Sequence, residues 1–423
     1  MLRLLILADD FTGALDTGVR FAARGIPTQV LTAQAYHFTE EDAEVLVINT
    51  ETRHLCPGEA GKIVRALTES AVRAGVPCIY KKTDSALRGN IGAELEAVLL
   101  GSGAAMLPFL PAFPELGRTT VGGRHYINGV PVNESPFGQD PFEPVRTAEV
   151  AALIGSQSQV PAKSFAALRQ GETAPEQMGI QIFDASGAEE LLESGKVLFR
   201  CAVPRVLAGC AGFAAFLPEL LGMSEGRECA LPKLSPHLLV LCGSVNPITR
   251  RQLEIAAEAG FCHVRLTPQQ KLEPAHFESA AGRAELAALK ERLAINPQMI
   301  VDSNDAGDNE VTKACAAKMG LSLDELRCRI VASLGEVLKG LMESPELGTL
   351  LLTGGDTLLQ CMTALGVQKV EPLGELESGI VLCQFLYQGK LHAVITKSGG
   401  FGEEDLLLRL ARFLEKETEG EKR

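Results

Sequence analysis

Two adjacent carboxylates, Asp9 and Asp10, directly follow a short apolar run at residues 4–8. Neighbouring acids of this kind can bind a metal ion, accept a sugar hydroxyl or exchange a proton. In parallel α/β sheets, ligands lie beyond the carboxyl ends of the strands, which is where these two side chains are expected. The other interpretation is that Asp10 or Thr12 only caps the following helix, although a cap needs one short polar residue rather than two acids.

A second polar cluster follows the apolar run at residues 77–80, and Arg53 lies in the loop after the run at residues 44–49. Cations beside acids and hydroxyls suit a small anion that carries hydroxyl groups, such as a sugar acid. The alternative is an ion-pair network that only closes helix ends. The cluster consists of Lys82, Thr83, Asp84, Ser85 and Arg88.

Three loops in the second half of the chain share one design, in which an apolar run leads through glycines and small hydroxyls into a helix. They begin near residues 243, 353 and 397. Glycine lets backbone N–H groups approach a ligand, and the following helix end is partially positive, so phosphate is the expected ligand. Neither a Walker lysine motif nor a Gly-x-Gly-x-x-Gly fingerprint is present. Asp356 could contact a metal, a ribose or an amine, or simply cap its helix.

Strands that alternate with helices must position these residues, which predicts an α/β fold with mainly parallel sheets and helices on both faces. A chain of 423 residues is too long for one ordinary core. A Gly-, Ser- and Pro-rich stretch at residues 222–236 places the boundary between two domains, 1–230 and 231–423. Strands are predicted at residues 4–8, 44–49, 77–80, 106–110, 181–184, 238–242, 299–302, 349–352 and 391–396.

The alternation stops between residues 117 and 144, where glycines and prolines surround two brief β-like runs. The pair Asn128-Gly129 predicts a tight hairpin turn. A long excursion of this kind inside an α/β domain is usually a lid or a binding loop. His125 within it could contact a ligand or be a solvated loop residue.

Composition excludes several classes of protein. A net charge of −13 argues against a general nucleic-acid surface, and no apolar run approaches the roughly 20 residues of a membrane helix. The 11 cysteines are scattered, which indicates reduced thiols in a cytoplasmic protein. Four of them are expected to be small hydrophobic residues in or beside buried runs: Cys201, Cys210, Cys242 and Cys383.

Taken together, these motifs resemble the four-carbon acid sugar kinase family. In the first half, the resemblance rests on residues 8–14, 82–90, 111–114, 117–119 and 128–131. In the second half, it rests on residues 243–244, 354–357 and 397–402. The chain departs from the family pattern at Ala86, where threonine is frequent, and at Gly400, where asparagine is frequent. Neither difference removes a charged group.

The resemblance implies ATP-dependent phosphorylation of threonate, erythronate or a 3-oxo-tetronate to its 4-phosphate, with Mg²⁺ as the metal, in a cleft between the two domains. It places the acid-sugar site at Asp9, Arg53 and residues 82–85, and the residues themselves add Asp10 and Arg88. No protein ligand to the metal is assigned. The expected partners are a sugar acid and ATP, in a cytoplasmic chain that could form a homodimer. The implied nucleotide site consists of Ser244, Gly354, Gly355, Asp356, Thr357 and Gly399.

Phosphoryl transfer requires in-line positioning, charge neutralisation and an acceptor for the proton of the attacking hydroxyl. We expect Arg53 and Lys82 to bind the substrate carboxylate, and either Asp9 or Asp84 to act as the catalytic acid that orients the terminal hydroxyl. Magnesium would bridge the phosphates, with mostly water and phosphate as its ligands.

Two other functions are alternatives to a kinase. A haloacid-dehalogenase-type phosphatase needs a second acid two residues after its nucleophilic aspartate, but that position is Phe11. A non-catalytic sensor of a nucleotide or sugar acid would not need clustered acids.

Overall fold

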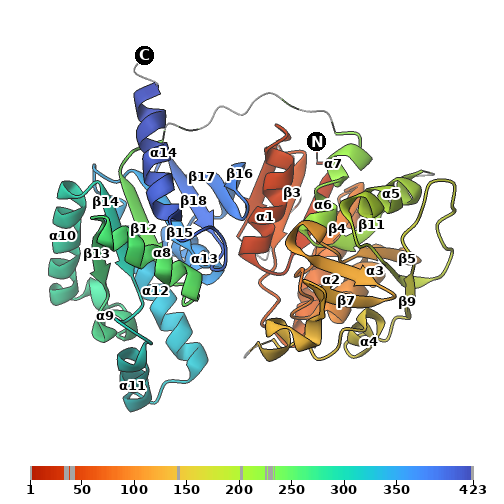
Figure 1. The fold of residues 1–423 in the computed structure, drawn as a ribbon, viewed down its shortest axis with the longest axis horizontal. Coiled ribbons are helices and arrows are strands. Elements are labelled where there is room, and N and C mark those ends of the chain that lie inside the picture. Colours follow the sequence, from red (N-terminus) through yellow and green to blue (C-terminus); the bar gives the residue numbers. More distant parts are fainter. Residues whose placement is uncertain are drawn as a thin grey trace. The chain divides into compact units, whose positions relative to one another are not determined.

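The computed structural model describes residues 2–32, 38, 43–140, 143–200, 203–223, 226, 232 and 234–420. The chain divides into two compact units, residues 1–229 and residues 230–423, called unit 1 and unit 2 below (Figure 1). The predicted boundary between residues 230 and 231 lies outside the described residues. In the described part of the chain, no helix combines the length and the apolar character needed to cross a membrane.

A parallel sheet forms the centre of unit 1, with the strand order β2-β3-β1-β4-β11-β5-β10-β9. The five strands predicted in this half are present. Three further strands, β2, β9 and β11, were not predicted, because each has only four residues and the first two mix polar with apolar side chains. The strands are β1 Leu4–Ala8, β2 Thr28–Leu31, β3 Val45–Asn49, β4 Cys78–Lys82, β5 Met106–Leu110, β9 Ala162–Phe165, β10 Gly179–Phe183 and β11 Val206–Gly209.

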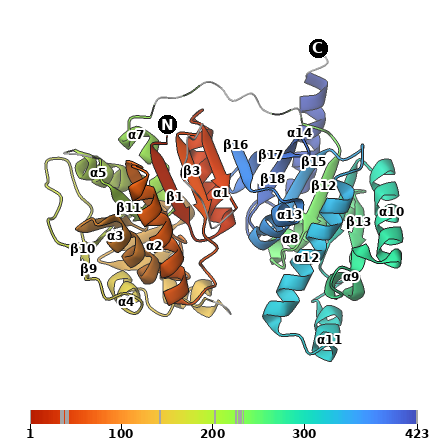
Figure 2. The same ribbon diagram turned by 180° about the vertical axis from the view of Figure 1, so that it is seen from behind.

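Helices cover both faces of this sheet (Figures 1 and 2). On one face, Leu5 and Leu7 of β1 share a core with Val64 of α2 and Leu95 of α3. On the other face, α1 contacts α6, and α5 contacts both α6 and α7. The predicted α/β class with helices on both faces is therefore confirmed for unit 1. The helices are α1 Phe11–Ala22, α2 Pro57–Arg73, α3 Ile91–Ser102, α4 Val150–Gly155, α5 Ala188–Phe199, α6 Ala211–Ala214 and α7 Leu217–Leu220.

The excursion after residue 117 folds into a small antiparallel sheet of its own, made of β6 Arg118–Val121, β7 Arg124–Ile127 and β8 Val130–Pro131. The predicted turn joins β7 to β8, with positive φ at both Asn128 and Gly129. Hydrogen bonds between the backbones of Thr120 and Ala185 attach this sheet to the end of β10. The segment is therefore a fixed part of unit 1 and not an irregular loop.

Unit 2 contains a mixed sheet with the order β13-β14-β12-β15-β18-β17-β16. The first five strands are parallel, whereas β18, β17 and β16 form an antiparallel meander that was not predicted. The four predicted strands are present, and the mainly parallel character is confirmed. The strands are β12 Leu238–Cys242, β13 Cys262–Arg265, β14 Gln298–Asp302, β15 Thr349–Thr353, β16 Lys369–Glu377, β17 Ile380–Tyr387 and β18 Lys390–Lys397.

Helices also pack on both faces of the second sheet. On one face, α8 contacts α14, and their apolar residues share a core with β12, as Leu253 and Leu410 do with Val240. The other face carries α12, which contacts α9, α10 and α13 (Figure 2). The helices are α8 Pro247–Glu258, α9 Pro268–Leu272, α10 Ala280–Ile295, α11 Glu310–Lys318, α12 Leu323–Leu341, α13 Gly355–Leu365 and α14 Leu406–Gly420.

Buried cysteines occur where the apolar runs predicted them. Cys210, Cys242 and Cys383 are each fully buried, so the prediction of small residues buried in or beside apolar runs is confirmed for these three. Burial raises the pKa of the Cys242 thiol well above its ordinary value, which keeps it protonated. The fourth, Cys201, lies outside the described residues.

Candidate active site

The carboxyl edge of unit 1 brings the predicted polar loops together. Ala8, the last residue of β1, is in register with Asn49 of β3 and with Lys82 of β4. Because the three strands are parallel, the loops that begin at Asp9, Thr50 and Thr83 leave the sheet side by side. Asn90 holds the middle loop in place, since its side-chain amide donates to the carbonyl oxygens of Thr52 at 2.7 Å and Leu55 at 2.8 Å.

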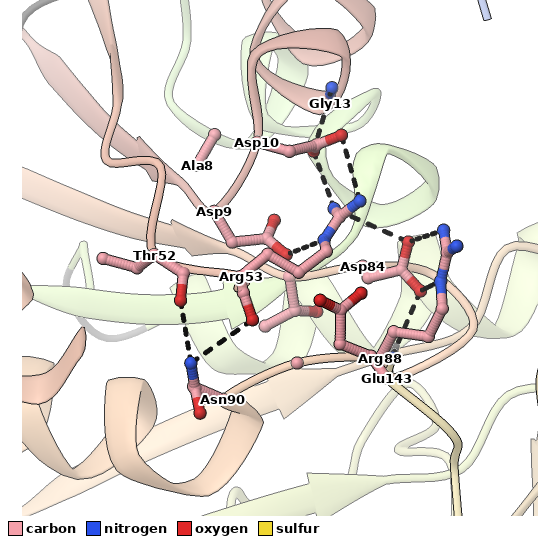
Figure 3. A network of polar contacts seen from close by, with 12 residues as sticks. Ala8, Asp9, Asp10, Gly13, Thr52, Arg53, Asp84, Arg88, Asn90 and Glu143 are labelled. Carbon is pink, nitrogen blue, oxygen red and sulfur yellow. Dashed lines mark hydrogen bonds and ion pairs between the residues drawn. The ribbon is translucent and has the colours of Figure 1, made fainter. Parts of the chain in front are cut away.

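Arg53 is the centre of a charged network that joins these loops (Figure 3). Its Nε lies 2.7 Å from Asp9 Oδ2, and its Nη2 lies 2.7 Å from Asp10 Oδ1 and 3.6 Å from Asp84 Oδ1. Burial alone would lower the pKa of Arg53, but Asp10, Asp9 and Asp84 outweigh that effect and raise the pKa well above its ordinary value. Arg53 is therefore permanently charged, and three carboxylates compensate its charge.

Asp10 caps the helix α1 and also belongs to the charged network around Arg53. The two interpretations of this residue from the sequence are therefore compatible. Its Oδ1 accepts a hydrogen bond from Gly13 N at 3.1 Å, which caps α1. The helix consequently begins at Phe11, three residues before the predicted start near residue 14. A Cβ atom on Gly13 would overlap Asp10 Oδ1 and lie 2.5 Å from Lys82 Nζ, so a larger residue here would force one of these side chains to move.

Asp84 is held on every side by hydrogen bonds from its own loop. Its Oδ2 accepts from Ala86 N at 3.0 Å and from Arg88 N at 3.2 Å. The Arg88 guanidinium adds a bidentate contact, Nε to Oδ2 at 3.1 Å and Nη2 to Oδ1 at 3.0 Å. Burial would raise the pKa of Asp84, but Arg88 and Arg53 outweigh it and hold the pKa well below its ordinary value. Such a saturated carboxylate is a weak proton acceptor.

Asp9 differs from Asp84 because one of its oxygens is free. Burial would raise its pKa, but Arg53, Lys82 and Lys81 together lower it, so the group is ionised. Asp9 Oδ2 is bound by Arg53, whereas Asp9 Oδ1 is buried and accepts no hydrogen bond from the described residues. Lys82 Nζ lies 3.9 Å from that free oxygen. A buried carboxylate oxygen without a partner is costly unless a ligand satisfies it.

The two neighbouring lysines of β4 have opposite surroundings, as the alternation of a strand requires. Lys81 Nζ lies 2.8 Å from Glu94 Oε2 of α3 and donates to the carbonyl oxygen of Leu7, so it is part of the buried core. Lys82 points to the carboxyl-edge network instead. Within the described residues its ammonium makes one ion pair, the 3.9 Å contact with Asp9. Lys82 is therefore less neutralised than Arg53.

The carboxyl edge of unit 2 collects the three predicted glycine loops. Cys242 of β12 is in register with Thr353 of β15, which is in register with Lys397 of β18. A Cβ atom on Gly399 would lie 2.7 Å from Ser244 Oγ, and one on Gly243 would overlap Thr357 Oγ1. Residues 155 and 114 positions apart in the chain thus meet in one cradle, with the α13 N-terminus beside it.

Gly354 and Asp356 lie beside this cradle. Gly354 has φ +101, which a side chain would strain, and it precedes the first turn of α13. Asp356 is exposed in that turn and lies 3.7 Å from Arg327 Nε, without capping the helix. The structure therefore brings together Ser244, Gly354, Thr357 and Gly399, and it leaves Asp356 at the rim.

The sequence of this chain matches family models and known proteins along most of its length. Residues 4–217 match the model of the sugar-binding N-terminal domain, and residues 239–407 match that of the nucleotide-binding C-terminal domain. A D-threonate kinase from Salmonella typhimurium is 31% identical over 98% of this chain and 99% of its own length. The chain belongs to the four-carbon acid sugar kinase family. The resemblance seen in the sequence motifs is thus confirmed, and the protein is an enzyme of the kinase class.

Other members of the four-carbon acid sugar kinase family are similarly related. A D-erythronate kinase from Heliobacterium modesticaldum is 28% identical over 96% of both chains. A 3-oxo-tetronate kinase from Methylobacterium radiotolerans is 28% identical over 96% of this chain and 98% of its own length. A solved structure from Salmonella typhimurium has the same fold, with a TM-score of 0.80 and 22% identity over 97% of this chain and 99% of its own.

Two further polar residues lie at the carboxyl edge of unit 2 and were not among the predicted site residues, Lys397 and Asn246. Lys397 Nζ is nearly buried and donates to Thr249 Oγ1 at 2.8 Å and to the carbonyl oxygen of Gly399 at 3.1 Å. Burial lowers the pKa of Lys397 to about 8. Asn246 caps α8 and lies against Gly399. Lys397 is the first residue of the family motif at residues 397–402, and this position was the sequence signal that could have identified it.

Two residues of the small antiparallel sheet, Arg118 and His125, also reach the unit 1 site. Arg118 Nη1 donates to Ser85 Oγ. His125 is fully buried and not solvated, and its Nε2 lies 2.9 Å from the carbonyl oxygen of Ser85. Arg118 was not among the predicted site residues, although it lies in the family motif at residues 117–119.

Thr83, which was predicted as a site residue, follows the end of β4. Its backbone N–H donates a hydrogen bond to the carbonyl oxygen of Gly209 on β11 at 2.9 Å.

The described residues contain no group of three or more His, Cys, Asp or Glu side chains arranged to hold a metal ion. The three clustered acids of unit 1 are occupied by Arg53, so they do not form a free oxygen cage.

Proposed function

We propose that this kinase transfers the γ-phosphoryl group of ATP to the terminal hydroxyl of threonate, erythronate or a 3-oxo-tetronate and forms the 4-phosphate. Unit 1 would bind the sugar acid and unit 2 the nucleotide. The names of the curated relatives support this range of substrates. The observation that carries the proposal is the free, buried Oδ1 of ionised Asp9 beside Lys82.

Asp9 is the group that we propose to orient the attacking hydroxyl. A hydroxyl placed at Asp9 Oδ1 would supply the hydrogen bond that this oxygen lacks among the described residues. Proton transfer to a positioned carboxylate in the transition state is general base catalysis. Asp84 is the weaker candidate, because Ala86 and Arg88 already occupy its oxygens. Asp84 would instead position Arg53 and Arg88.

The cations divide into positioning and binding groups. Arg53 holds the three carboxylates in place, and we propose that it acts mainly through them. Lys82 has a weak ion pair and would interact with an anionic group of the bound substrates. Asp10 and Thr83 keep the two loops in register through α1 and β11.

The nucleotide would lie in the unit 2 cradle formed by Ser244, Gly354, Thr357 and Gly399, where the glycines let the loops approach one another closely and place no side chain over their backbone N–H groups. When bound, ATP supplies the phosphoryl group to be transferred. Backbone N–H groups of these loops would hold its phosphates, and Lys397 would keep the Gly399 carbonyl turned away from them. Magnesium would accompany the nucleotide with water and phosphate ligands.

The test is ADP release by the purified protein with ATP and magnesium, using D- and L-threonate, D- and L-erythronate and their 3-oxo forms. We expect one acid to support strong turnover. Asp9→Asn should lower kcat by about 10²- to 10⁴-fold, the usual contribution of a positioned acid or base. The control is Glu69→Gln, which alters an exposed acid of α2 paired with Arg65.

Three results would contradict the proposal. Turnover with none of the acids would exclude these substrates. Phosphate release from sugar phosphates without ATP would indicate a phosphatase. Tight binding of both ligands without ADP formation would indicate a sensor.

A further inference from the structure

Most of the cations at the unit 1 carboxyl edge are already neutralised by acids of the same site. Arg53 pairs with three carboxylates. Arg88 pairs with Asp84 at 3.0 Å and with Asp140 at 3.4 Å. A guanidinium held in this way has little capacity left for a second carboxylate. Of the cations at this edge described so far, only Lys82, with its 3.9 Å contact to Asp9, is weakly paired, so a planar carboxylate would need a further partner with several N–H donors.

Arg118 is a cation of the same region that lacks an acidic partner within the described residues. It begins β6 of the small sheet, is partly buried, and donates from Nη1 to Ser85 Oγ. Its guanidinium carbon lies 5.4 Å from the centre of the Phe137 ring, and that of Arg88 lies 5.2 Å from the same centre. Stacking on an aromatic face supports a guanidinium and leaves donors on its edge available.

The charge of Arg118 acts on the site itself. It contributes to lowering the pKa of Asp84, after the larger contributions of Arg88 and Arg53. It also acts together with Lys82 on Cys210, where both cations oppose the rise in pKa that burial causes. Both cations therefore act on the buried Cys210, Arg118 from the small sheet and Lys82 from β4.

The small sheet holds Arg118 in a fixed position. The Asp184 carboxylate accepts hydrogen bonds from Gly122 N at 2.7 Å and Gly123 N at 2.9 Å, which fixes the turn after β6. His125 Nε2 lies 2.9 Å from the carbonyl oxygen of Ser85, which ties the sheet to the Ser85 loop. A binding group that is already held in place loses little conformational entropy when its ligand arrives.

We propose that Arg118, together with Ser85 Oγ, binds the carboxylate of the sugar acid and thereby selects an acid over a neutral sugar of the same length. The inference rests on the proposed function, because it assumes that the ligand is a sugar acid. A planar fork of N–H donors matches a carboxylate in a bidentate arrangement, and Ser85 Oγ adds a hydroxyl at its side. Arg118 would thus be a specificity-determining residue that is separate from the phosphoryl-transfer group Asp9.

The test compares Arg118→Gln and Arg118→Lys with the wild-type enzyme. The matched control is Arg124→Gln, which removes another arginine of the same sheet, one that pairs with Glu149 at the surface. For each protein, KM and kcat are measured with the preferred acid and with ATP. An inhibition constant is measured for the four-carbon polyol in which a hydroxymethyl group replaces the carboxylate. Binding of the acid is measured separately by calorimetry.

We expect Arg118→Gln to raise KM for the acid about 10- to 100-fold, as the loss of a charge-assisted bidentate contact predicts. The KM for ATP and the inhibition constant of the polyol should stay within about twofold. Arg118→Lys should recover part of the affinity, because it keeps the charge but not the fork. Arg124→Gln should behave like the wild type.

Two outcomes would overturn the inference while leaving the proposed function intact. An unchanged KM for the acid in Arg118→Gln would show that Arg118 does not touch the carboxylate. Equal weakening of the acid and the polyol, with no recovery in Arg118→Lys, would show that Arg118 only supports Ser85. If the wild type phosphorylates no sugar acid but binds one, the proposed function fails, and the calorimetric comparison still decides the role of Arg118. If the wild type binds no sugar acid, both fail.

Discussion

His125 Nε2 lies 2.9 Å from the carbonyl oxygen of Ser85, and this hydrogen bond joins the small antiparallel sheet to the loop after β4. Because a carbonyl oxygen can only accept, Nε2 must carry the proton. His125 Nδ1 then accepts from the hydroxyl of Thr120, which lies 2.9 Å away. Burial lowers the pKa of His125 to about 4, so the neutral ring is the form that fits this site.

Protonation of His125 should therefore destabilise the fold in acid. Its pKa is about 4 when folded and near 6.5 in an unfolded chain, so the unfolded state binds the proton more tightly. The stabilisation is complete above pH 6.5 and is lost as the pH falls towards 4, by about 3 kcal/mol at most. His125→Gln keeps an N–H donor but does not titrate. In urea unfolding between pH 7 and pH 4, the difference in free energy between wild type and variant should shrink, and parallel curves would contradict the assignment.

Asp9 and Asp84 should respond differently to the loss of charge. Asp84→Asn leaves Arg88 and Arg53 without their shared acid, so we expect a loss of unfolding free energy of about 3 kcal/mol or more. Asp9→Asn should instead reduce kcat strongly and keep the KM for ATP, since it removes the free acceptor oxygen. Thermal unfolding and steady-state ADP release separate the two effects. If the two variants lost the same activity at equal stability, the division of roles would be wrong.

A methyl group at Gly13 should damage the sugar-acid site and leave the fold intact. The added Cβ would lie 2.5 Å from Lys82 Nζ and overlap Asp10 Oδ1, which forces one of the two side chains to move. We expect the KM for the sugar acid to rise about tenfold or more, by analogy with the loss of one charged contact. Gly58→Ala in the first turn of α2 is the matched control, because nothing lies within 4 Å of its Cβ. Equal kinetics for both variants would exclude a role for this close approach.

In unit 2, the adjacent glycines Gly399 and Gly400 allow a similar pair of variants to test the proposed nucleotide site. A Cβ on Gly399 would lie 2.7 Å from Ser244 Oγ, whereas one on Gly400 would meet Asn246 Nδ2 at an ordinary 3.6 Å. Gly399→Ala should raise the KM for ATP by about tenfold or more and leave that for the sugar acid unchanged. Gly400→Ala should have little effect. A change in sugar-acid affinity without one in ATP affinity would argue against a nucleotide site in this cradle.

The small antiparallel sheet shows which structural features a local sequence pattern can predict and which it cannot. The Asn128-Gly129 turn was predictable, because this residue pair favours positive φ at two successive positions. The burial of His125 was not, because it depends on Ser85 and Thr120, which approach the ring only after β4 and β6 have taken their places. The antiparallel strands β16 and β17 were missed for a related reason, since their pairing depends on β18 and not on their own composition.

The sequence by itself determined the α/β class, the main parallel strands, the sheet edges that carry the candidate site residues and the family. Buried parallel strands are continuous apolar runs, and the polar residues after each run must lie at one edge of the sheet. Only the tertiary structure decided which charges are already satisfied. Arg53 meets Asp9 across 44 residues of chain, Arg118 meets Ser85 across 33, and Lys397 meets Thr249 across 148. Such pairings depend on strand register and side-chain packing over long distances, so no local pattern distinguishes Asp9, with its free oxygen, from the saturated Asp84.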